Sequence, residues 1–258
     1  MANDLHLKKE AFARLLTIMD ELREKCPWDK KQTFESLRML TLEEAYELSD
    51  AILKKNQTDI KEEIGDLFLH LVFYSKMGEE NGAFDVYDCL QGICEKLIRR
   101  HPHIYSDVKV ENEEEVKRNW EQIKLGEGKK SVLSGVPASL PALIKAYRIQ
   151  EKTSQVGFDW ENLAQVWDKV EEEMGEFKEE LEKNISMERK EEEFGDLLFS
   201  LVNYARFQGI NPENALAKVN LKFTERFSYL ENKAGETLTG MSMEEMNILW
   251  NEAKRQQK

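Results

Sequence analysis

An acidic pattern that occurs twice constrains the fold of this chain more than any other feature. Its first copy has E-E-x-x-E at residues 43–47 and E-x-x-D at 63–66, and its second copy has the same acids at 172–176 and 193–196. Positions three or four residues apart lie on one face of a helix, so the acids of each segment project together. If the two helices of a copy lie side by side, four carboxylates converge on a small volume. The pattern therefore predicts two acidic helical hairpins.

Carboxylates at such short range repel one another, so they need either full solvation or a counter-cation. Ligands that are all oxygen favour a hard cation such as Mg2+, which also binds the phosphates of substrates. The alternative interpretation is two solvated acidic faces on amphipathic helices, in which Glu44 caps its own helix. The repetition of the pattern, with apolar residues beside the acids, favours the metal site.

The duplication extends beyond the acids. At an offset of about 130 residues, 63–74 align with 193–204 and keep both acids, the glycine between them and several apolar residues. Both halves then continue with K-x-x-x-R and, later, with W-x-x-x-K. Such self-similarity is the signature of a repeated structural unit. Glycine, proline and serine are concentrated in residues 126–141, which predicts a linker between helical domains at 1–125 and 142–258.

The composition agrees with a helix-rich protein. Charged residues make up 34% and hydrophobic residues 41% of the 258 residues, with 13 glycines and five prolines, which is typical of an all-α chain. The formal charge of -13 argues against a nucleic acid duplex as partner, because phosphate binding requires a basic surface. A nucleotide stays compatible, because a bound divalent cation inverts the local sign of the charge.

Apolar periodicity predicts helices along most of the chain. The first half should have a helix over 5–25, a short helix or turn over 33–40, and helices over 41–55, 58–82, 84–100 and 113–124. The second half should have helices over 143–153, 163–183, 187–207, 214–230 and 242–256. Thr41 is predicted to be the N-cap of the first acidic helix, with an acid three residues later as in a capping box.

The cysteine content and the hydropathy of the sequence indicate the cellular location of the protein. The three cysteines form no C-x-x-C pair, so we expect reduced thiols in a cytoplasmic protein rather than a disulfide framework or a zinc site. The N-terminal segment does not resemble a signal peptide. No apolar run approaches the roughly 20 residues of a membrane span, so we expect no membrane partner.

A basic pair follows the acids in each half, at Lys96 and Arg100 and again at Lys222 and Arg226. Facing the carboxylates from a third helix, such a pair would neutralise a metal-bound polyphosphate. Attack by water on phosphorus then depends mainly on positioning and charge stabilisation. The alternative is an ordinary i,i+4 pair on the surface, which the recurrence makes less attractive. Trp250 either stacks on a base or packs in the core, and both interpretations stay open.

Other catalytic arrangements are not supported by the sequence. No phosphate-binding glycine loop is present, and the second half contains no histidine, so a mechanism shared by both halves cannot depend on one. A di-iron bundle would require E-x-x-H pairs, which do not occur. An acidic helical module that binds a nucleotide or a protein without turnover is the non-enzymatic alternative.

Several blocks of the sequence carry a resemblance to a known family. They are CPWDKKQTF at 26–34, LEEAYE at 42–47, EIGDLF at 63–68, RRHPH at 99–103, VGFDW at 156–160 and EFGDLLF at 193–199. With these blocks and its tandem layout, the chain resembles the MazG family of nucleoside triphosphate pyrophosphohydrolases over essentially its whole length.

The resemblance implies an all-α fold of two tandem repeats, each of the four-helix-bundle type and completed by homodimerisation. It also implies hydrolysis of NTPs and dNTPs between the α- and β-phosphates, which gives a nucleoside monophosphate and pyrophosphate and clears aberrant or surplus nucleotides. The implied cofactor is Mg2+, with Mn2+ as a substitute. The expected partners are thus nucleotide substrates and a second copy of the chain.

The resemblance also assigns site residues. The metal ligands would be Glu173, Glu176, Glu193 and Asp196, with first-copy counterparts Glu44, Glu47, Glu63 and Asp66. Glu172 and Glu43, the first acids of each motif, would either lie behind the metal ligands or orient the water, and Glu172 is counted with the second-copy acids in catalysis. Nucleotide contacts would come from Lys169, Glu172, Arg189, Glu192, Asp196, Lys222, Arg226 and Trp250, and in the first copy from Lys96 and Arg100. Because Arg189 aligns with Asp59, the second copy is the favoured site of turnover.

Overall fold

The computed structural model describes residues 4–112, 115–116, 119–120, 123, 126–127, 131–183 and 186–256. The chain divides into two compact units, 1–113 and 114–258, which are described separately. Over the described ranges the regular structure is helical and no strand occurs, so the predicted all-α class is confirmed. Within those ranges no helix is both long and apolar enough to cross a membrane.

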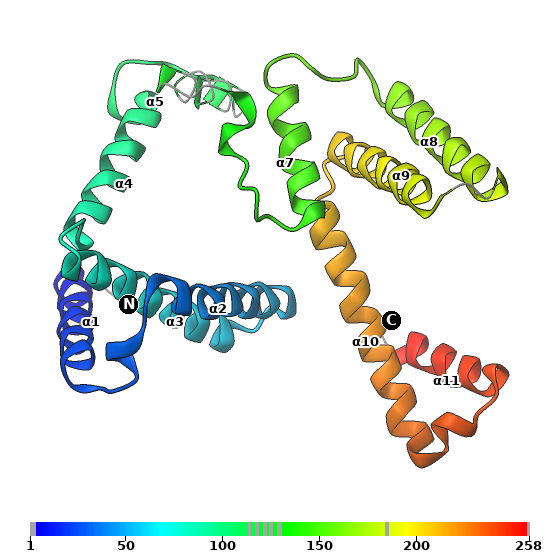
Figure 1. Cartoon of the computed structure of the whole chain (residues 1–258), viewed down its shortest axis with the longest axis horizontal. Coiled ribbons are helices and arrows are strands. Elements are labelled where there is room, and N and C mark those ends of the chain that lie inside the picture. The colour runs from blue at the N-terminus through cyan, green and yellow to red at the C-terminus, as the bar shows by residue number, and fades with distance from the viewer. Residues whose placement is uncertain are drawn as a thin grey trace. The chain divides into compact units, whose positions relative to one another are not determined.

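The first unit is a helical assembly centred on the acidic hairpin (Figure 1). Its elements are α1 (Leu5–Lys25), the 3-10 helix η1 (Asp29–Lys31), α2 (Phe34–Lys54), α3 (Gln57–Glu80), α4 (Val86–Arg100) and the short α5 (Pro102–Tyr105). Helices α2 and α3 pack along each other, α1 packs on α3, and α4 follows from the end of α3. The acids of the first copy therefore lie on two neighbouring helices.

A small apolar core joins α1, α2 and α3. Met19, Leu37, Val72, Phe73 and Met77 are almost completely buried and contact one another. Partly buried residues at helical spacing from them, such as Leu16, Phe34 and Leu69, pack against this group, so each helix contributes one stripe to the core. Burying side chains of this size stabilises the unit by roughly 1.5–3 kcal/mol each. Apolar side chains thus fill the centre of the contact between α1 and α3, and a small cavity of about 210 Å3 lies beside it.

The structure corrects the predicted start of the first acidic helix. Thr33, not Thr41, is the N-cap of α2, because its side chain accepts from the Ser36 N–H and Ser36 reciprocates in a capping box. Thr41 lies inside the helix, where its hydroxyl donates to the Leu37 carbonyl at 3.0 Å and lies 2.8 Å from the Tyr74 hydroxyl. Because the Thr33 side chain accepts a hydrogen bond from the first turn, the helix begins at Phe34 and not after Thr41. The acids after Thr41 are therefore not capping residues.

The second unit repeats the acidic hairpin. Its elements are η2 (Val132–Gly135), α7 (Ala142–Ser154), α8 (Leu163–Lys183), α9 (Met187–Phe207), α10 (Pro212–Ala234), η3 (Gly235–Gly240) and α11 (Met243–Gln256). Helices α8 and α9 pack along each other, α7 packs on α9, and α10 pairs with α11 (Figure 1). The predicted ranges of α8 and α9 agree with the structure, and α10 is longer than predicted.

The predicted domain boundaries stay a prediction. Residues 131–141 of the predicted linker belong to the second unit, where η2 packs against α7. The predicted helix over 113–124 falls largely on residues outside the described ranges, and so does Lys124 of the repeated W-x-x-x-K.

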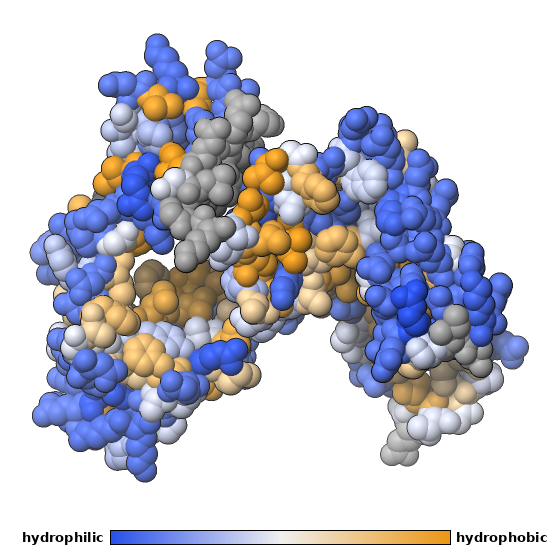
Figure 2. Space-filling view, turned by 45° about the horizontal axis from the view of Figure 1, so that its top comes forward, coloured by the Kyte–Doolittle hydropathy of each residue, from blue (hydrophilic) through white to orange (hydrophobic). Residues whose placement is uncertain are grey.

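Both units expose apolar side chains on a helix that follows the hairpin. On α4 these are Tyr87, Leu90, Ile93 and Leu97, and on α10 they are Leu216, Val219, Phe223 and Phe227. The space-filling view shows apolar residues, drawn orange, at the surface in broad patches (Figure 2). The spacing of three and four residues makes each set a stripe along one helix face.

Candidate metal centres and active site

Each unit brings three of its predicted metal ligands together. Glu44, Glu63 and Asp66 offer carboxylate oxygens that all lie within 4.8 Å of one another, and Glu173, Glu193 and Asp196 do the same in the second unit. We call these the first and second acidic clusters. In each cluster one acid comes from the first hairpin helix and two come from the second, as helix periodicity predicts.

Two further predicted ligands lie near the clusters without belonging to these groups. Glu47 is one of the charges that raise the pKa of Glu63, after burial as the largest cause. Glu176 raises the pKa of Glu193 in the same way. Their negative charges thus reach the clusters, and their role as metal ligands stays a prediction.

The first acidic cluster is electrostatically strained. Burial, followed by the charges of Asp66 and Glu47, raises the pKa of Glu44 above its ordinary value. Among the ion pairs of the described residues, none involves a carboxylate of this cluster. Within the part of the chain that the structure describes, the three acids of this cluster therefore have no ion-pair partner.

The second acidic cluster has two cations within its own helices. Lys169 Nζ lies 2.8 Å from a Glu172 oxygen and 2.7 Å from a Glu173 oxygen. These two carboxylates raise the pKa of the Lys169 ammonium. The ammonium compensates the charge of Glu173, which is almost completely buried.

Arg189 is the second of these cations. It lies 2.6 Å from Glu192, 2.7 Å from Glu193 and 3.8 Å from Glu180. Burial raises the pKa of Glu193, and the Arg189 charge partly offsets that rise. Two side chains that can bind phosphate therefore hold the acids of the second cluster by ion pairs.

The donor set of the second cluster fits a hard divalent cation. All three groups are carboxylates, which Mg2+ and Mn2+ accept as ligands. The second oxygen of Glu173, Oε2, is buried and has no hydrogen-bond partner. An unpartnered buried carboxylate oxygen is costly unless a cation reaches it. The residues present are therefore compatible with a metal at this position.

A cavity of about 460 Å3 adjoins the second cluster. Glu173, Asp196 and Lys169 form part of its wall, and the remainder comes from α7, from the loop after α7 and from the C-terminal half of α9. Those other lining residues are Ile149, Gln150, Thr153, Gly157, Phe158, Asp159, Trp160, Phe199, Ser200, Asn203 and Arg206. We call this space the α7–α9 cavity.

The predictions did not include this cavity. The VGFDW block at 156–160 carries part of the family resemblance, and its last four residues line the wall. The available signal was an aromatic, glycine-containing break directly before an acidic helix. That pattern alone does not distinguish a pocket wall from a packed turn.

The second-copy basic pair and its tryptophan lie elsewhere in the unit. Lys222 and Arg226 are on α10, which leaves the C-terminal end of α9 and extends away from it (Figure 1). The Arg226 guanidinium lies 5.8 Å from the Trp250 ring centre, and Phe223 packs on the same ring at 5.0 Å. None of these residues lines the α7–α9 cavity. Trp250 therefore packs against α10, and the nucleotide contacts predicted for this group stay predictions.

In the first unit, the predicted nucleotide-binding residues Lys96 and Arg100 lie on the C-terminal half of α4. Helix α4 packs against α3, which carries two acids of the first cluster. Their contribution to nucleotide binding likewise stays a prediction.

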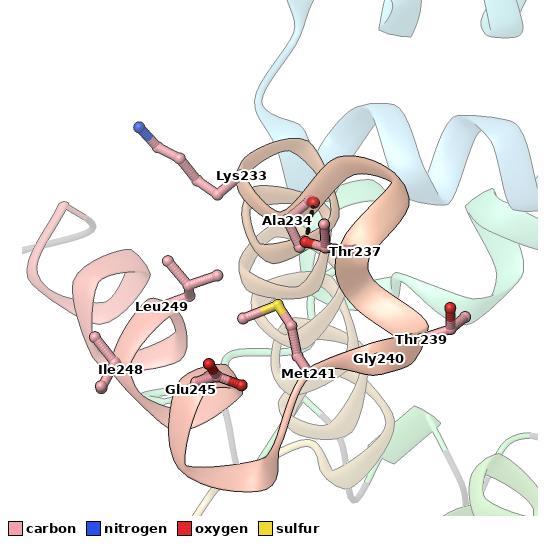
Figure 3. Close-up of a pocket in the computed structure, with 9 residues that line it drawn as sticks. All are labelled: Lys233, Ala234, Thr237, Thr239, Gly240, Met241, Glu245, Ile248 and Leu249. Carbon is pink, nitrogen blue, oxygen red and sulfur yellow. Dashed lines mark hydrogen bonds between the residues drawn. The ribbon is translucent and has the colours of Figure 1, made fainter.

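A larger hollow of about 740 Å3 lies between the end of α10, η3 and α11 (Figure 3). Its wall contains Met241, Ile248 and Leu249, and the Thr237 hydroxyl donates to the Ala234 carbonyl at 2.6 Å. The Lys233 side chain points away from it (Figure 3). The hollow contains no residue of either acidic cluster, so it offers no comparable chemistry.

Comparison with known proteins supports one family for both halves. The sequence profile of the MazG nucleotide pyrophosphohydrolase domain matches residues 32–105 and 162–230. The nucleoside triphosphate pyrophosphohydrolase of Escherichia coli K12 is 46% identical over 255 residues, covering 95% of this chain and 97% of that protein. The nucleoside triphosphate pyrophosphohydrolase/pyrophosphatase MazG of Thermotoga maritima is 44% identical and covers 94% of this chain and 95% of that protein.

Among solved structures, a MazG-related protein from Thermotoga maritima is 28% identical, with a TM-score of 0.40 over 44% of this chain and 98% of that chain. The profile matches contain both acidic hairpins, and the relatives align over nearly the full length. The chain therefore belongs to the MazG family.

Proposed function

We propose that this protein is a nucleoside triphosphate pyrophosphohydrolase, which cleaves NTPs and dNTPs between the α- and β-phosphates. The observation that carries the proposal is the second acidic cluster, with Lys169 and Arg189 beside it, at the wall of the α7–α9 cavity. The names of the relatives from Escherichia coli and Thermotoga maritima support the same reaction. Its products would be a nucleoside monophosphate and pyrophosphate, and its role the clearance of aberrant or surplus nucleotides.

The acids of the second cluster would hold the divalent cation. Glu173 and Glu193 approach from neighbouring helices, so each helix of the hairpin contributes to the site. We propose Mg2+ as the ion, with Mn2+ as a substitute, because the ligands are all carboxylates. When bound, such an ion withdraws charge from phosphate oxygens. Glu176 completes the proposed ligand set.

The basic side chains of Lys169 and Arg189 would release their carboxylate partners and bind the phosphates of the substrate instead. Lys169 and Arg189 each hold an acid of the cluster, and the triphosphate offers oxygens of the same charge. Water would attack the α-phosphorus, the bond between that phosphorus and the α–β bridging oxygen would break, and pyrophosphate would leave. Glu172, which lies beside Lys169, would orient that water and accept its proton.

We further propose a homodimer. The exposed apolar stripes of α4 and α10 support it, because monomeric proteins rarely leave large contiguous apolar patches in water (Figure 2). A second copy of the chain could cover either stripe by helix packing. Lys222, Arg226 and Trp250 on α10, and Lys96 and Arg100 on α4, would contribute to nucleotide binding in that assembly.

The test is a product assay on the full chain with MgCl2 and a panel of NTPs and dNTPs. Pyrophosphate should be released rather than orthophosphate. Glu193→Gln should lower its release by about 100-fold or more, because a ligand on the buried side of the cluster is lost. Glu63→Gln is the matched change in the first unit and should retain most of the activity. Circular dichroism would verify that both variants remain helical.

Two outcomes would contradict the proposal. Orthophosphate as the initial product would place the cleavage elsewhere, and full activity in both variants would remove the acidic clusters from the chemistry. Nucleotide binding without any product would favour the alternative function, a non-catalytic acidic helical module. The same assay thus separates the enzyme from the binding module.

A further inference from the structure

Glu180 is a largely buried acid of the second unit that does not belong to the repeated acidic pattern. It lies on α8 one helical turn after Glu176, and therefore on the helix face that carries Glu173 and Glu176. Its side chain is only 13% exposed. One of its oxygens, Oε2, is buried and has no hydrogen-bond partner. A buried carboxylate oxygen without a partner is costly, so this atom favours a donor that can approach it.

The guanidinium of Arg189 lies within reach of Glu180 without being hydrogen-bonded to it. Arg189 Nη2 is 3.8 Å from Glu180 Oε1 and 2.7 Å from Glu193 Oε1, and Arg189 Nη1 is 2.6 Å from Glu192. The first of these distances is too long for a hydrogen bond, whereas the other two are short charge-assisted contacts. The Arg189 side chain is 47% exposed, so it has room to move. A shift of about 1 Å toward α8 would bring Nη2 to hydrogen-bond distance of Glu180.

The first unit lacks both members of this pair. The residue aligned with Glu180 is Ala51, and the residue aligned with Arg189 is Asp59. The three acids of each cluster, in contrast, occur at aligned positions in both units. Glu180 therefore occurs together with Arg189 and not with the acidic pattern. This difference between the two halves indicates that the partner of Glu180 is the guanidinium.

The contact between Arg189 and Glu193 conflicts with a metal-binding role of Glu193. Glu193 is almost completely buried, and the Arg189 charge partly offsets the rise that burial causes in the pKa of Glu193. A guanidinium and a divalent cation on the same carboxylate repel each other, so Arg189 has to weaken its contact when Glu193 becomes a metal ligand. Without a second acceptor, the Arg189 side chain would then extend into water.

We propose that Glu180 is a positioning residue, which binds the Arg189 guanidinium when Glu193 becomes a ligand of the divalent cation. This inference rests on the proposed function, because it takes Glu193 as a metal ligand. Arg189 then stays beside the second acidic cluster, where it can bind the phosphates of the substrate. The exchange also favours binding of the cation, because an ion pair with Glu180 replaces the one that Glu193 gives up.

The experiment is a double-mutant cycle of Glu180 and Arg189, with Mn2+ alone as the probe. Glu180→Gln, Arg189→Gln and the double variant are made in the full chain that carries Glu63→Gln, because this change removes one acid of the first cluster. The dissociation constant of Mn2+ is measured by electron paramagnetic resonance without any nucleotide. Thermal unfolding of each variant verifies that it is folded.

Two further variants test whether the effect is specific. Glu180→Ala copies the aligned Ala51 and removes the acid with a residue that suits a helix. Glu179→Gln removes the same charge one residue earlier, from an exposed pair with Lys183 at 2.8 Å. This control should leave the dissociation constant of Mn2+ unchanged, because exposed pairs contribute little.

Glu180→Gln and Glu180→Ala should each weaken Mn2+ binding by about tenfold, because Arg189 then remains on Glu193. Arg189→Gln should not weaken it, because a competing cation is removed. With Arg189→Gln present, Glu180→Gln should change the dissociation constant by less than about twofold, since the residue through which Glu180 acts is absent. Equal losses with and without Arg189 would overturn the inference, because Glu180 would then act by its own charge or as a ligand. Unchanged binding in both Glu180 variants, or weaker binding in Arg189→Gln alone, would also overturn it.

Failure of this inference and failure of the proposed function give different results. Mn2+ binding needs no turnover, so the expected cycle in a protein that releases no pyrophosphate would support the role of Glu180 and overturn the reaction. Pyrophosphate release together with additive losses in the cycle would support the reaction and overturn the role of Glu180. Mn2+ binding that Glu193→Gln leaves unchanged would overturn the metal site and this inference with it.

Discussion

The two units build the same acidic hairpin but fill the adjoining space differently. In the first unit, His70 and Phe73 of α3 are buried, and Phe73 belongs to the core between α1 and α3. The residues 130 positions later are Ser200 and Asn203, both smaller, and both line the α7–α9 cavity. Replacing two rings by a hydroxyl and an amide leaves a space where the first unit has a core.

The two units also differ in the basic side chains around their acidic clusters. Lys169 and Arg189 contact acids of the second cluster, whereas Leu40 and Asp59 occupy the aligned positions in the first unit. The first cluster thus retains the acids without cations at these two positions. The acidic pattern alone therefore does not distinguish the two copies, whereas the smaller and the basic residues around the second cluster do.

The largest expected effect comes from filling the cavity. Asn203→Phe places in the second unit the residue that fills the same position in the first. It should lower kcat/KM for nucleoside triphosphates by about 100-fold, because the ring fills the cavity that adjoins the second acidic cluster. Steady-state kinetics of the full chain would measure the loss, and far-UV circular dichroism would verify the helices.

The matched change in the first unit is Phe73→Leu. It should lower the free energy of unfolding of that unit by about 1–2 kcal/mol, because a buried ring is replaced by a smaller side chain. Hydrogen exchange of residues 57–80 would report that loss, while kcat/KM stays unchanged. If instead Phe73→Leu impaired turnover and Asn203→Phe did not, the roles of the two units would be reversed.

The next effect concerns the cations. Lys169→Leu copies the aligned residue of the first unit and should lower kcat/KM by about 30-fold, since a charge-assisted contact with phosphate is lost. Without the ammonium, Glu173 is buried without its ion-pair partner, so Mg2+ should raise the melting temperature of this variant more than that of the wild type. Kinetics and thermal unfolding at several Mg2+ concentrations measure both effects.

Lys183→Leu is the control for that variant. Lys183 forms an exposed i,i+4 pair with Glu179 at 2.8 Å, at the far end of the same helix. Its loss should change neither kcat/KM nor the response to Mg2+, because exposed pairs contribute little. Equal behaviour of the two lysine variants would remove Lys169 from the site.

Much of this arrangement could be predicted from the sequence because it depends on local spacing. The ranges of α8 and α9 follow from apolar periodicity, and the joining of Glu173, Glu193 and Asp196 follows from two i,i+3 patterns on paired helices. The ion pair of Lys169 with Glu173 likewise spans four residues. Family membership was equally accessible, because the motifs that carry it are contiguous.

Features that depend on tertiary packing were not accessible. Thr33 and Thr41 are both suitable N-caps, and only the continuation of the core stripe through Leu37 selects Thr33. The α7–α9 cavity depends on where three separate segments meet, and an aromatic residue such as Phe158 has the same sequence signature in a core as in a pocket. The missed features are thus those in which one segment decides what another can contact.

The smallest expected effect is a pH dependence confined to the first unit. Arg23 of α1 binds Glu80 at the end of α3, and this hydrogen bond lowers the pKa of Glu80 below its ordinary value of 4.5. A carboxyl group with a lowered folded-state pKa stabilises the fold above its unfolded-state pKa, and that stabilisation is lost as the pH falls through the folded-state value. The contribution should therefore be complete at pH 7, decline as the pH falls below 4.5 and disappear below the folded-state pKa.

Glu80→Gln tests this ion pair and the comparison together. At pH 7 it should lower the free energy of unfolding of the first unit by about 1 kcal/mol, a modest figure because Glu80 is partly exposed. The difference from the wild type should shrink as the pH falls below 4.5, and pyrophosphate release at pH 7 should not change. Glu79→Gln, at an exposed pair with Lys76, is the control and should show little effect at any pH. A loss of turnover in Glu80→Gln would contradict a purely structural role for the contact between α1 and α3, because the proposed active site lies in the second unit.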